Sequence, residues 1–510
     1  MRLTALISCS MLALSTSAAT VKVITSTEGN EWQQKKVSLQ SKPSGKVMLS
    51  VKESSHGVPF IAWGTCFNEL DWDVYRNLCT EEQNSIMSKL FAPDGELHFT
   101  KGRLTMNAND YSRAWYSCSD VSGDFELRHF NIEHDKQNVI NLIHSAIRQN
   151  NAMTFFMSPW SPPAWMKINQ DYPVQSNRFN TADPKKDYLL FSRPDGKPLS
   201  EEEQSLLGER EGVYPRRLAL QDYFIQDSRY LQCYADMFCR FIELYAAEGI
   251  CINRVMYQNE AYSYTPYPGC AWTAEGTIRF NRDYLAPTLS ARHPEVELYL
   301  GTFNTNRKDY IEQILSDSKL RNSIKGMGVQ WECRQIIPEL QKEFPGLHWV
   351  CSEAECGNGD MDWKAAEHSF FLISDNLGNG VDEYYIWNFL LADNGRSTWN
   401  WTQNALIQFN SKAEQDSQRV RYTPEYYATR HFSQFIGKDD EMIGYVGREH
   451  SDTPIVAYRL KPGKKGILKN AEYVVVAGNL TEKPTVLTIE INGKYLNFAA
   501  QPHSFNTFIV

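Results

Sequence analysis

Residues 251–260, CINRVMYQNE, form a short apolar run that ends in Asn259 and Glu260. Seven further runs of this kind follow the same pattern of an apolar body and a polar or aromatic end. They are 60–67 (FIAWGTCF), 98–106 (HFTKGRLTM), 152–160 (AMTFFMSPW), 296–304 (VELYLGTFN), 324–333 (IKGMGVQWEC), 347–355 (LHWVCSEAE) and 381–389 (VDEYYIWNF). Runs of this length and composition are typical of strands buried on both faces of a parallel sheet.

Apolar residues at helical spacing lie between these runs. Three such stripes begin at Val139, Tyr230 and Trp363. Eight strands alternating with helices predict an α/β fold, a closed (β/α)8 TIM barrel, rather than a sandwich. We expect this barrel to span residues 56–435.

The two ends of the chain have a different pattern. In residues 436–510, strand-like runs alternate with turn signals such as Asn492-Gly493, and residues 20–55 are also strand-like. We expect the C-terminal strands to form an accessory all-β sandwich, which the N-terminal strands join. The polar segment 170–216 is too long for an ordinary loop, and we expect it to shape a substrate cleft.

Residues 1–19 have the features of a signal peptide: Arg2, an apolar stretch over 3–14, and a small-residue site at Ser17-Ala18-Ala19. The sequence therefore predicts export to the periplasm, the cell surface or the medium. No later run is long enough to span a membrane, so we expect no stable membrane insertion. The net charge of -9 and the absence of a basic cluster argue against nucleic acid as a partner. Oligomeric state is not encoded in any pattern found here.

The eleven cysteines do not form a pair of C-x-x-C motifs, and no His/Cys cluster suggests a metal site. We expect no metal and no cofactor. An exported protein is compatible with one or two disulfides, whose pairing the sequence does not give.

In a (β/α)8 barrel, chemistry takes place at the carboxyl ends of the strands. The fourth candidate strand ends in Glu260, and the seventh ends in Cys351-Ser352-Glu353-Ala354-Glu355. Two carboxyl groups about 5–5.5 Å apart are what retaining glycoside hydrolysis requires. Glu353 and Glu355 share a strand face by period two, so spacing alone leaves either as the second carboxylate.

Seven motifs in order resemble glycoside hydrolase family 30, which includes lysosomal glucosylceramidase and bacterial β-1,6-glucanases and β-glycosidases. The resemblance spans about residues 56–510. The motifs are Gly64–Leu70 (GTCFNEL), Gly102-Arg103 through Asn109-Asp110-Tyr111, Ser158–Lys167 (SPWSPPAWMK), Gln258-Asn259-Glu260, Ser352-Glu353-Ala354, Tyr385–Asn388 (YIWN) and Gly395–Trp401 (GRSTWNW).

The resemblance implies a role for each matching residue. Glu260 matches the acid/base, and Glu353 matches the nucleophile, with Glu355 as the alternative. The substrate-binding residues that it implies are Arg103, beside the carboxylate pair; Asp110, at glucose hydroxyls; Trp160, Trp331 and Trp387, as aromatic contacts; Asn259, at the sugar 2-hydroxyl; and Asn400, at another hydroxyl. Gln330 stands where the glucosylceramidase pattern has His, which argues against ceramide specificity.

The predicted function is a retaining β-glycosidase acting by double displacement on a β-linked glucan, oligosaccharide or glycoside, with β-1,6-glucan as the leading substrate. Glucosylceramidase, β-xylosidase and β-fucosidase activities of the same family remain alternatives. A non-catalytic carbohydrate-binding barrel and a metal-dependent barrel hydrolase are alternatives from other classes.

Overall fold

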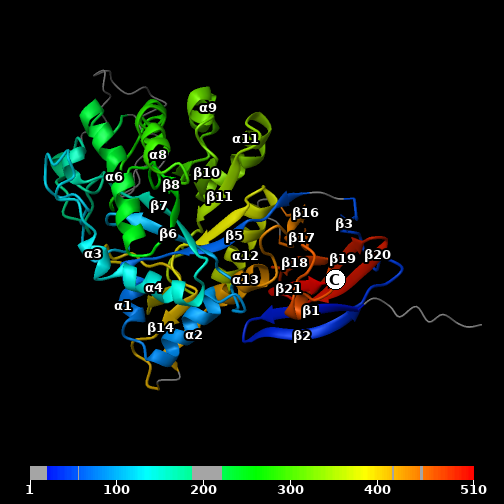
Figure 1. The fold of residues 1–510 in the computed structure, drawn as a ribbon. Helices are drawn as coiled ribbons and strands as arrows, with labels where there is room; N and C mark the ends of the chain where they lie inside the picture. Colours follow the sequence, from blue (N-terminus) through cyan, green and yellow to red (C-terminus); the bar gives the residue numbers. More distant parts are fainter. Residues whose placement is uncertain (1–19, 55–56, 187–220, 416–417, 448–451) are drawn as a thin grey trace, which may run out of the picture.

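The computed structural model describes residues 20–54, 57–186, 221–415, 418–447 and 452–510 (Figure 1). The predicted signal peptide and most of the segment 170–216 lie outside the described residues.

Eight parallel strands close into a barrel in the order β10-β11-β12-β5-β6-β7-β8-β9. Each of the eight predicted runs contains one of these strands, so the predicted TIM barrel is confirmed. The strands are β5 Ala62–Cys66, β6 Lys101–Met106, β7 Thr154–Pro159, β8 Ile252–Met256, β9 Glu297–Phe303, β10 Gly326–Gln330, β11 His348–Glu353 and β12 Glu383–Ile386. The runs extend past the strand ends because the first residues of several following loops are also buried.

Helices surround the barrel (Figure 1). The predicted stripes at 139, 230 and 363 correspond to α4 Val139–Gln149, α6 Ser228–Ala247 and α12 Trp363–Gly378. The other helices are α1 Glu69–Tyr75, α2 Thr80–Phe91, α3 Glu133–Lys136, α7 Ala274–Phe280, α8 Ala286–Arg292, α9 Lys308–Ser316, α10 Ser318–Arg321, α11 Ile337–Glu343 and α13 Pro424–Ser433. Helical turns of other types are η1 Ala164–Met166, η3 Asn281–Leu285, η4 Trp331–Ile336 and η6 Gly466–Leu468.

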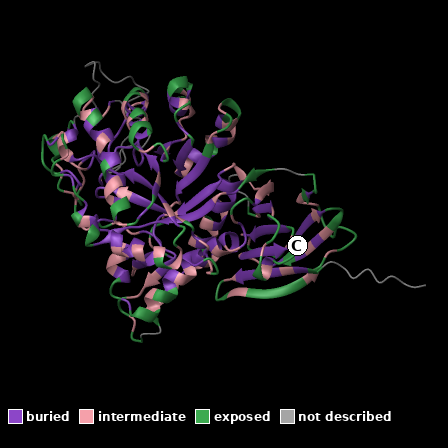
Figure 2. Cartoon of the chain, in the orientation of Figure 1, coloured by how far each residue is buried: buried purple, intermediate pink, exposed green. Residues whose placement is uncertain are grey.

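The barrel interior is filled by side chains. Five large residues from different strands form one buried cluster: Phe156, Met256, Tyr299, Val350 and Tyr385. Gly64 gives Tyr385 room, because a Cβ at this position would lie 2.5 Å from its ring. Figure 2 shows this buried interior in purple. A filled interior leaves only the ends of the strands available to a ligand.

The accessory β-structure contains both ends of the described chain, as predicted. A seven-stranded sheet has the order β2-β1-β21-β18-β17-β16-β4, and a three-stranded sheet has the order β20-β19-β3. The strands are β1 Thr20–Thr27, β2 Asn30–Ser38, β3 Leu49–Val51, β4 Val58–Pro59, β16 Glu441–Val446, β17 Ile455–Arg459, β18 Tyr473–Asn479, β19 Thr485–Ile491, β20 Lys494–Ala500 and β21 Ser504–Ile509. The two sheets share an apolar core, as a sandwich requires.

Stacked aromatic rings join the sandwich to the barrel. Phe505 of β21 stacks on Trp363 and Phe370 of α12, with ring centroids 4.8 Å and 4.6 Å apart. Beside them, His431 of α13 is hydrogen-bonded to Thr507 and Ser26. Helices α12 and α13 are therefore packed between the barrel and the sandwich.

A third sheet was not predicted. It consists of β13 Leu390–Ala392, β14 Ile407–Phe409 and β15 Val420–Tyr422. Strands of three residues are too short to give a periodic signal. The loop between β13 and β14, residues 393–406, lies beside the barrel mouth and is called the β13–β14 loop below.

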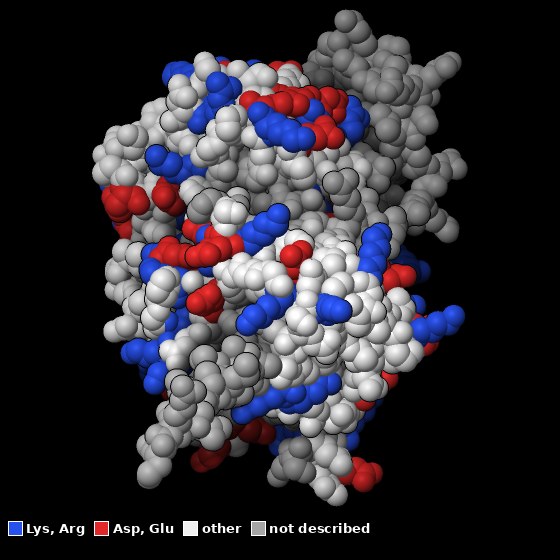
Figure 3. Space-filling view, turned by 90° about the vertical axis from the view of Figure 1, so that its right-hand side faces the viewer, with Lys and Arg blue, Asp and Glu red and all other residues white. Residues whose placement is uncertain are grey.

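All ten cysteines from Cys66 to Cys356 are free thiols, so the described residues contain none of the disulfides considered from the sequence. Acidic and basic side chains are intermixed on the described part of the face in Figure 3. Within the described ranges, no helix has the length and apolar character needed to cross a bilayer.

Candidate active site

Glu260 and Glu353 line one cavity of about 310 Å³ at the carboxyl ends of the barrel strands. Glu353 is the last residue of β11, and Glu260 lies in the loop that follows β8. The cavity is lined by Asp110, Trp160, Asn177, Phe179, Asn259, Glu260, Tyr264, Pro266, Tyr267, Trp331, Glu353, Cys356, Gly357, Trp401, Thr402 and Gln403. Asn177 and Phe179 belong to the described part of the segment that we expected to shape the cleft.

Arg103 contacts Glu353 directly. Its Nη1 donates to Glu353 Oε2 at 2.7 Å, and the guanidinium is completely buried. It also donates to the backbone oxygen of Ser352 at 3.0 Å and to Asn259 Oδ1 at 2.7 Å. Arg103 is not among the described residues that line the cavity. Its predicted role beside the carboxylate pair fits this position, whereas direct sugar binding does not.

Burial raises the pKa of Glu353 to about 8. The Arg103 guanidinium lowers this pKa, while the carboxyl groups of Glu260 and Asp110 raise it further. The expected effect of the arginine therefore has the right direction, but burial and two neighbouring carboxyl groups outweigh it.

Glu260 has a different partner from Glu353. The hydroxyl of Tyr267 donates to Glu260 Oε2 at 2.5 Å, and the Glu260 backbone N–H donates to Thr302 Oγ1 at 3.3 Å. Glu260 is in the left-handed region with φ 48°, which turns its side chain sharply from the direction of β8. One glutamate thus contacts a cation and the other contacts a phenol.

Three donors fix the side chain of Asn259. Its Oδ1 accepts hydrogen bonds from Arg103 Nη2 at 2.7 Å, Gln330 Nε2 at 2.8 Å and Thr302 Oγ1 at 3.0 Å. The N–H₂ group of the same amide donates to none of the described residues, so it can serve a ligand in the cavity that Asn259 lines. Gln330 also donates to Glu353 Oε2 at 3.3 Å.

Trp160 lines the cavity, and Trp387 lies behind it. The two rings stack with centroids 5.1 Å apart and an interplanar angle of 24°. Trp387 Nε1 donates to Gln403 Oε1 at 2.9 Å. Trp387 is not one of the described lining residues of this cavity, so it supports Trp160 and Gln403 rather than forming a wall itself.

Asp110 and Trp331 both line the cavity, but Asn400 does not. Asn400 is exposed and accepts a hydrogen bond from Arg396. It occupies a left-handed turn, with φ 69°, at the tip of the β13–β14 loop. The following residues, Trp401 to Gln403, line the cavity instead, because the turn at Asn400 reverses the direction of the chain.

Glu355, the alternative nucleophile, lies outside this cavity. Its carboxylate pairs with Arg334 at 3.1 Å and His368 at 3.0 Å. Strand β11 ends at Glu353, so the period-two alternation that would place Glu355 on the same face does not continue.

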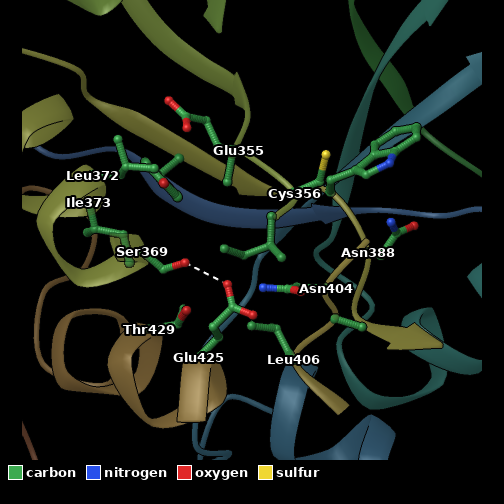
Figure 4. A pocket seen from close by; sticks show the side chains of 15 residues that line it. Glu355, Cys356, Ser369, Leu372, Ile373, Asn388, Asn404, Leu406, Glu425 and Thr429 are labelled. Atoms are coloured by element: carbon green, nitrogen blue, oxygen red, sulfur yellow. Dashed lines mark hydrogen bonds between the residues drawn. The ribbon is translucent and has the colours of Figure 1, made fainter. Parts of the chain in front are cut away.

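Glu355 instead lines a second, much smaller cavity between the barrel and helices α12 and α13 (Figure 4). Ser369 Oγ donates to Glu425 Oε1 at 2.6 Å in this cavity. Its volume is about 20 Å³, which accommodates a water molecule but no sugar. The larger cavity is therefore the candidate active site.

Sequence reasoning missed several lining residues, of which Tyr267 is the most important. The stretch from Tyr257 to Tyr267 contains four tyrosines, and spacing does not reveal which of them turns back to Glu260. Trp401 is the last residue of a quoted motif, and Thr402 and Gln403 follow it, so proximity to Asn400 was the available signal.

Comparison with known proteins identifies the family. The model of the glycosyl hydrolase family 30 TIM-barrel domain matches residues 62–182 and 223–436, more than half of the chain. A Caenorhabditis elegans protein named "Putative glucosylceramidase 3" is 25% identical over 433 residues, covering 80% of this chain and 72% of the relative. Endo-1,6-beta-D-glucanase of Neurospora crassa is 22% identical over 425 residues, covering 81% and 75%.

Solved structures show the same fold over nearly the whole chain. SrfJ from Salmonella typhimurium has a TM-score of 0.77 at 19% identity, covering 96% of this chain and 99% of that one. The endo-β-1,6-glucanase BT3312 has a TM-score of 0.73 at 17% identity, covering 96% and 98%. With the barrel, the glutamate-lined cavity and the family match in agreement, the chain belongs to glycosyl hydrolase family 30 and is a glycoside hydrolase.

Proposed function

We propose that the protein is a retaining β-glycosidase, with Glu353 as nucleophile and Glu260 as acid/base. The observation that supports this assignment is the asymmetry of the pair: Arg103 contacts Glu353 at 2.7 Å, whereas the Tyr267 phenol contacts Glu260 at 2.5 Å. A guanidinium stabilises the ionised form that a nucleophile needs. A phenol donor orients a carboxyl group without adding a positive charge.

In the first step, a carboxylate oxygen of Glu353 attacks the anomeric carbon and the bond to the leaving oxygen breaks. Glu260 transfers its proton to that oxygen, so the aglycone departs as a neutral alcohol. The product of this step is a glycosyl ester on Glu353. The fixed N–H₂ group of Asn259 is available to the sugar 2-hydroxyl, whose hydrogen bond strengthens in the transition state.

In the second step, Glu260 is ionised and accepts a proton from water. The water oxygen attacks the anomeric carbon, the ester bond to Glu353 breaks, and Glu260 regains its proton. Two inversions at one carbon give net retention. Trp160 supplies a flat apolar surface suited to a sugar ring, and Asp110 supplies a carboxylate suited to paired hydroxyls.

The proposed substrate is a β-linked glucoside or glucan, with β-1,6-glucan first. Support comes from Asp110 in the cavity and from relatives named endo-1,6-beta-D-glucanase in three fungi. Glucosylceramide is the second candidate substrate, since the Caenorhabditis elegans relatives are named putative glucosylceramidases. β-Xylosides and β-fucosides follow it.

The assignment is tested with an activated 2-fluoro glycoside and peptide mass spectrometry. The expected label is on Glu353; a label on Glu355 would overturn the nucleophile assignment. In a Glu260→Ala variant, added azide is expected to restore turnover of an activated aryl glycoside and to give a β-glycosyl azide. An α-azide product would contradict the retaining mechanism.

We also propose that residues 1–19 direct export of the chain. The support for this proposal is the signal-peptide pattern of these residues. Amino-terminal sequencing of the protein recovered outside the cytoplasm is expected to begin near Thr20. A start at Met1 would contradict cleavage.

A further inference from the structure

We propose that the enzyme removes single sugars from the non-reducing end of its substrate, because two joined loops close the cavity beyond Asp110. This inference rests on the proposed function and adds the position in the sugar chain at which the enzyme acts.

The positions of the two glutamates define the direction of the bound chain. The acid/base protonates the departing oxygen, so the aglycone lies on the side of Glu260. Tyr267, in the loop after β8, donates to Glu260 and lines the cavity at this residue. In the proposed mechanism Asp110 and Trp160 hold the sugar to be released, so this sugar lies toward Asp110.

Beyond that side, the loop after β6 (residues 107–132, the β6 loop) is joined to the β13–β14 loop. The Tyr111 hydroxyl donates to the backbone oxygen of Gly395 at 2.7 Å. The Thr398 hydroxyl donates to the backbone oxygen of Ser112 at 2.8 Å. We call the two loops with these contacts the glycone wall.

Two tryptophans strengthen the glycone wall. Trp115 of the β6 loop stacks on Trp399 of the β13–β14 loop, with centroids 4.7 Å apart and an interplanar angle of 24°. Tyr111 and Trp399 are both buried, so the contacts between the two loops are shielded from solvent.

The wall directly adjoins the cavity in the chain. Asp110 lines the cavity and directly precedes Tyr111 of the wall. Residues Trp401 to Gln403 also line the cavity and closely follow Trp399 of the wall. In the barrel, β5 lies between β12 and β6, so the two loops meet across the end of β5.

A second attachment holds the far side of the β13–β14 loop. Asn404 Oδ1 accepts hydrogen bonds from the backbone N–H of Gly359 at 2.8 Å and of Met361 at 3.4 Å, in the segment after β11. Moving the wall aside would therefore break contacts on both sides of the loop.

The size of the cavity agrees with a closed glycone side. Its volume of about 310 Å³ is at the lower end of the range for ligand sites, about 300–1,000 Å³. A site that binds the interior of a polysaccharide needs room for sugars on both sides of the scissile bond. In the part of the chain that the structure describes, the glycone side has a wall where a second sugar would continue.

This proposal departs from the names of the fungal relatives, which are endo-1,6-beta-D-glucanases. They are 20–22% identical to this chain. Loops at the barrel mouth vary more than the strands that carry them, so the position of cleavage does not follow from family membership.

The test compares linear β-1,6-gluco-oligosaccharides of defined length with the same compounds capped by a 4,6-benzylidene group on the non-reducing terminal glucose. At low conversion, the uncapped compounds are expected to give glucose and the oligomer shorter by one unit. The cap is expected to lower kcat/KM at least 100-fold. Early release of internal fragments, or a capped compound cleaved within two-fold of the uncapped one, would overturn the proposal.

A Thr398→Ala/Trp399→Ala variant tests the wall itself, with Trp32→Ala in β2 of the sandwich as a control loss of a tryptophan outside the wall. Thermal unfolding of each variant reports its fold. The wall variant is expected to cleave the capped compounds at least 10-fold faster than wild type, and the control is not. If the wall variant does not fold, the rates of the wild-type enzyme on capped and uncapped compounds still show whether it acts at the non-reducing end. Absence of hydrolysis of every uncapped compound and aryl glycoside would instead reject the proposed function.

Discussion

At the scale of single residues, Glu353 shows how burial and a neighbouring cation oppose each other. Removing a carboxylate from water favours its protonated form, and Arg103 at 2.7 Å recovers only part of that cost. The arginine is itself held by Ser158, Ser352 and Asn259, so its position does not depend on the substrate.

The first prediction concerns the pH–rate profile. Burial and the carboxyl groups of Glu260 and Asp110 raise the pKa of Glu353 to about 8, so the ionised nucleophile becomes more abundant as pH rises toward 8. On an activated aryl glycoside, whose leaving group needs little help from an acid, we expect kcat/KM to rise with pH through this range. Initial rates between pH 4 and 10 measure this, and Glu260→Gln is expected to move the rise to lower pH because it removes one of the carboxyl groups that raise this pKa. A rise at the same pH in wild type and Glu260→Gln would contradict the coupling between the two glutamates.

The second prediction concerns Tyr267. A Tyr267→Phe change removes the donor to Glu260 and keeps the ring, so it misorients the acid without emptying the site. We expect kcat to fall about 10–100-fold for poor leaving groups and about 3-fold or less for activated ones, because only the former need the acid. Kinetics on a series of aryl glycosides measure this. Tyr172→Phe, which loses a bond to Asp120 on a neighbouring loop, is the control. Equal losses for all leaving groups would show a purely structural role.

At the scale of elements, helices α12 and α13 enclose a buried carboxyl group. Glu425, in the first turn of α13, receives a hydrogen bond from Ser369 of α12. Burial raises the pKa of Glu425 to about 7, although Ser369 and Asn404 lower it.

This raised pKa predicts a pH-dependent stability. The folded state binds a proton at Glu425 between its ordinary pKa and about 7, so the stabilisation is present at low pH and is lost as pH rises through 7. We expect Glu425→Gln to gain stability relative to wild type between pH 4.5 and 7.5, by up to roughly 3 kcal/mol. Urea unfolding at both pH values measures the difference. Glu472→Gln, an exposed control in the sandwich, is expected to show a much smaller change. A stability difference between Glu425→Gln and wild type that stays constant with pH would contradict the assignment.

At the scale of the whole molecule, the sandwich and the barrel form one structure through a few buried rings. Phe505 is fully buried and stacks on α12, which also contributes to the barrel. The N-terminal strands β1 and β2 pair in one sheet with strands from the C-terminal end of the chain. The sandwich is therefore built from segments that precede and follow the barrel in the sequence.

We expect Phe505→Ala to cost about 3–5 kcal/mol, as deletion of a buried aromatic ring does. Because the ring links the sandwich to the barrel, we also expect the calorimetric transition of the variant to be broader than that of wild type or to split, with the sandwich unfolding first. Val486→Ala on the exposed face of β19 is the control and is expected to leave the transition unchanged. A single sharp transition at an unchanged midpoint in Phe505→Ala would show that the ring does not couple them.

The sequence by itself determined the barrel, the strands that close it and the place of the two glutamates at its carboxyl end, with Glu353 ending β11 and Glu260 in the loop after β8. Apolar runs and helical stripes are local patterns, and strand order follows from them in an alternating α/β chain. Asp110, Trp160, Asn259 and Trp331 line the cavity, and their roles in binding substrate stay predictions.

Only the tertiary structure decided which side chains beyond the strand ends face the cavity. Glu355 turns away because β11 ends at Glu353, and Asn400 turns outward at a left-handed residue. Tyr267 and the glycone wall depend on contacts between segments far apart in the chain, such as Tyr111 with Gly395. Loop direction has no fixed period, so residue spacing carries no information about it, whereas packing of the folded chain fixes it.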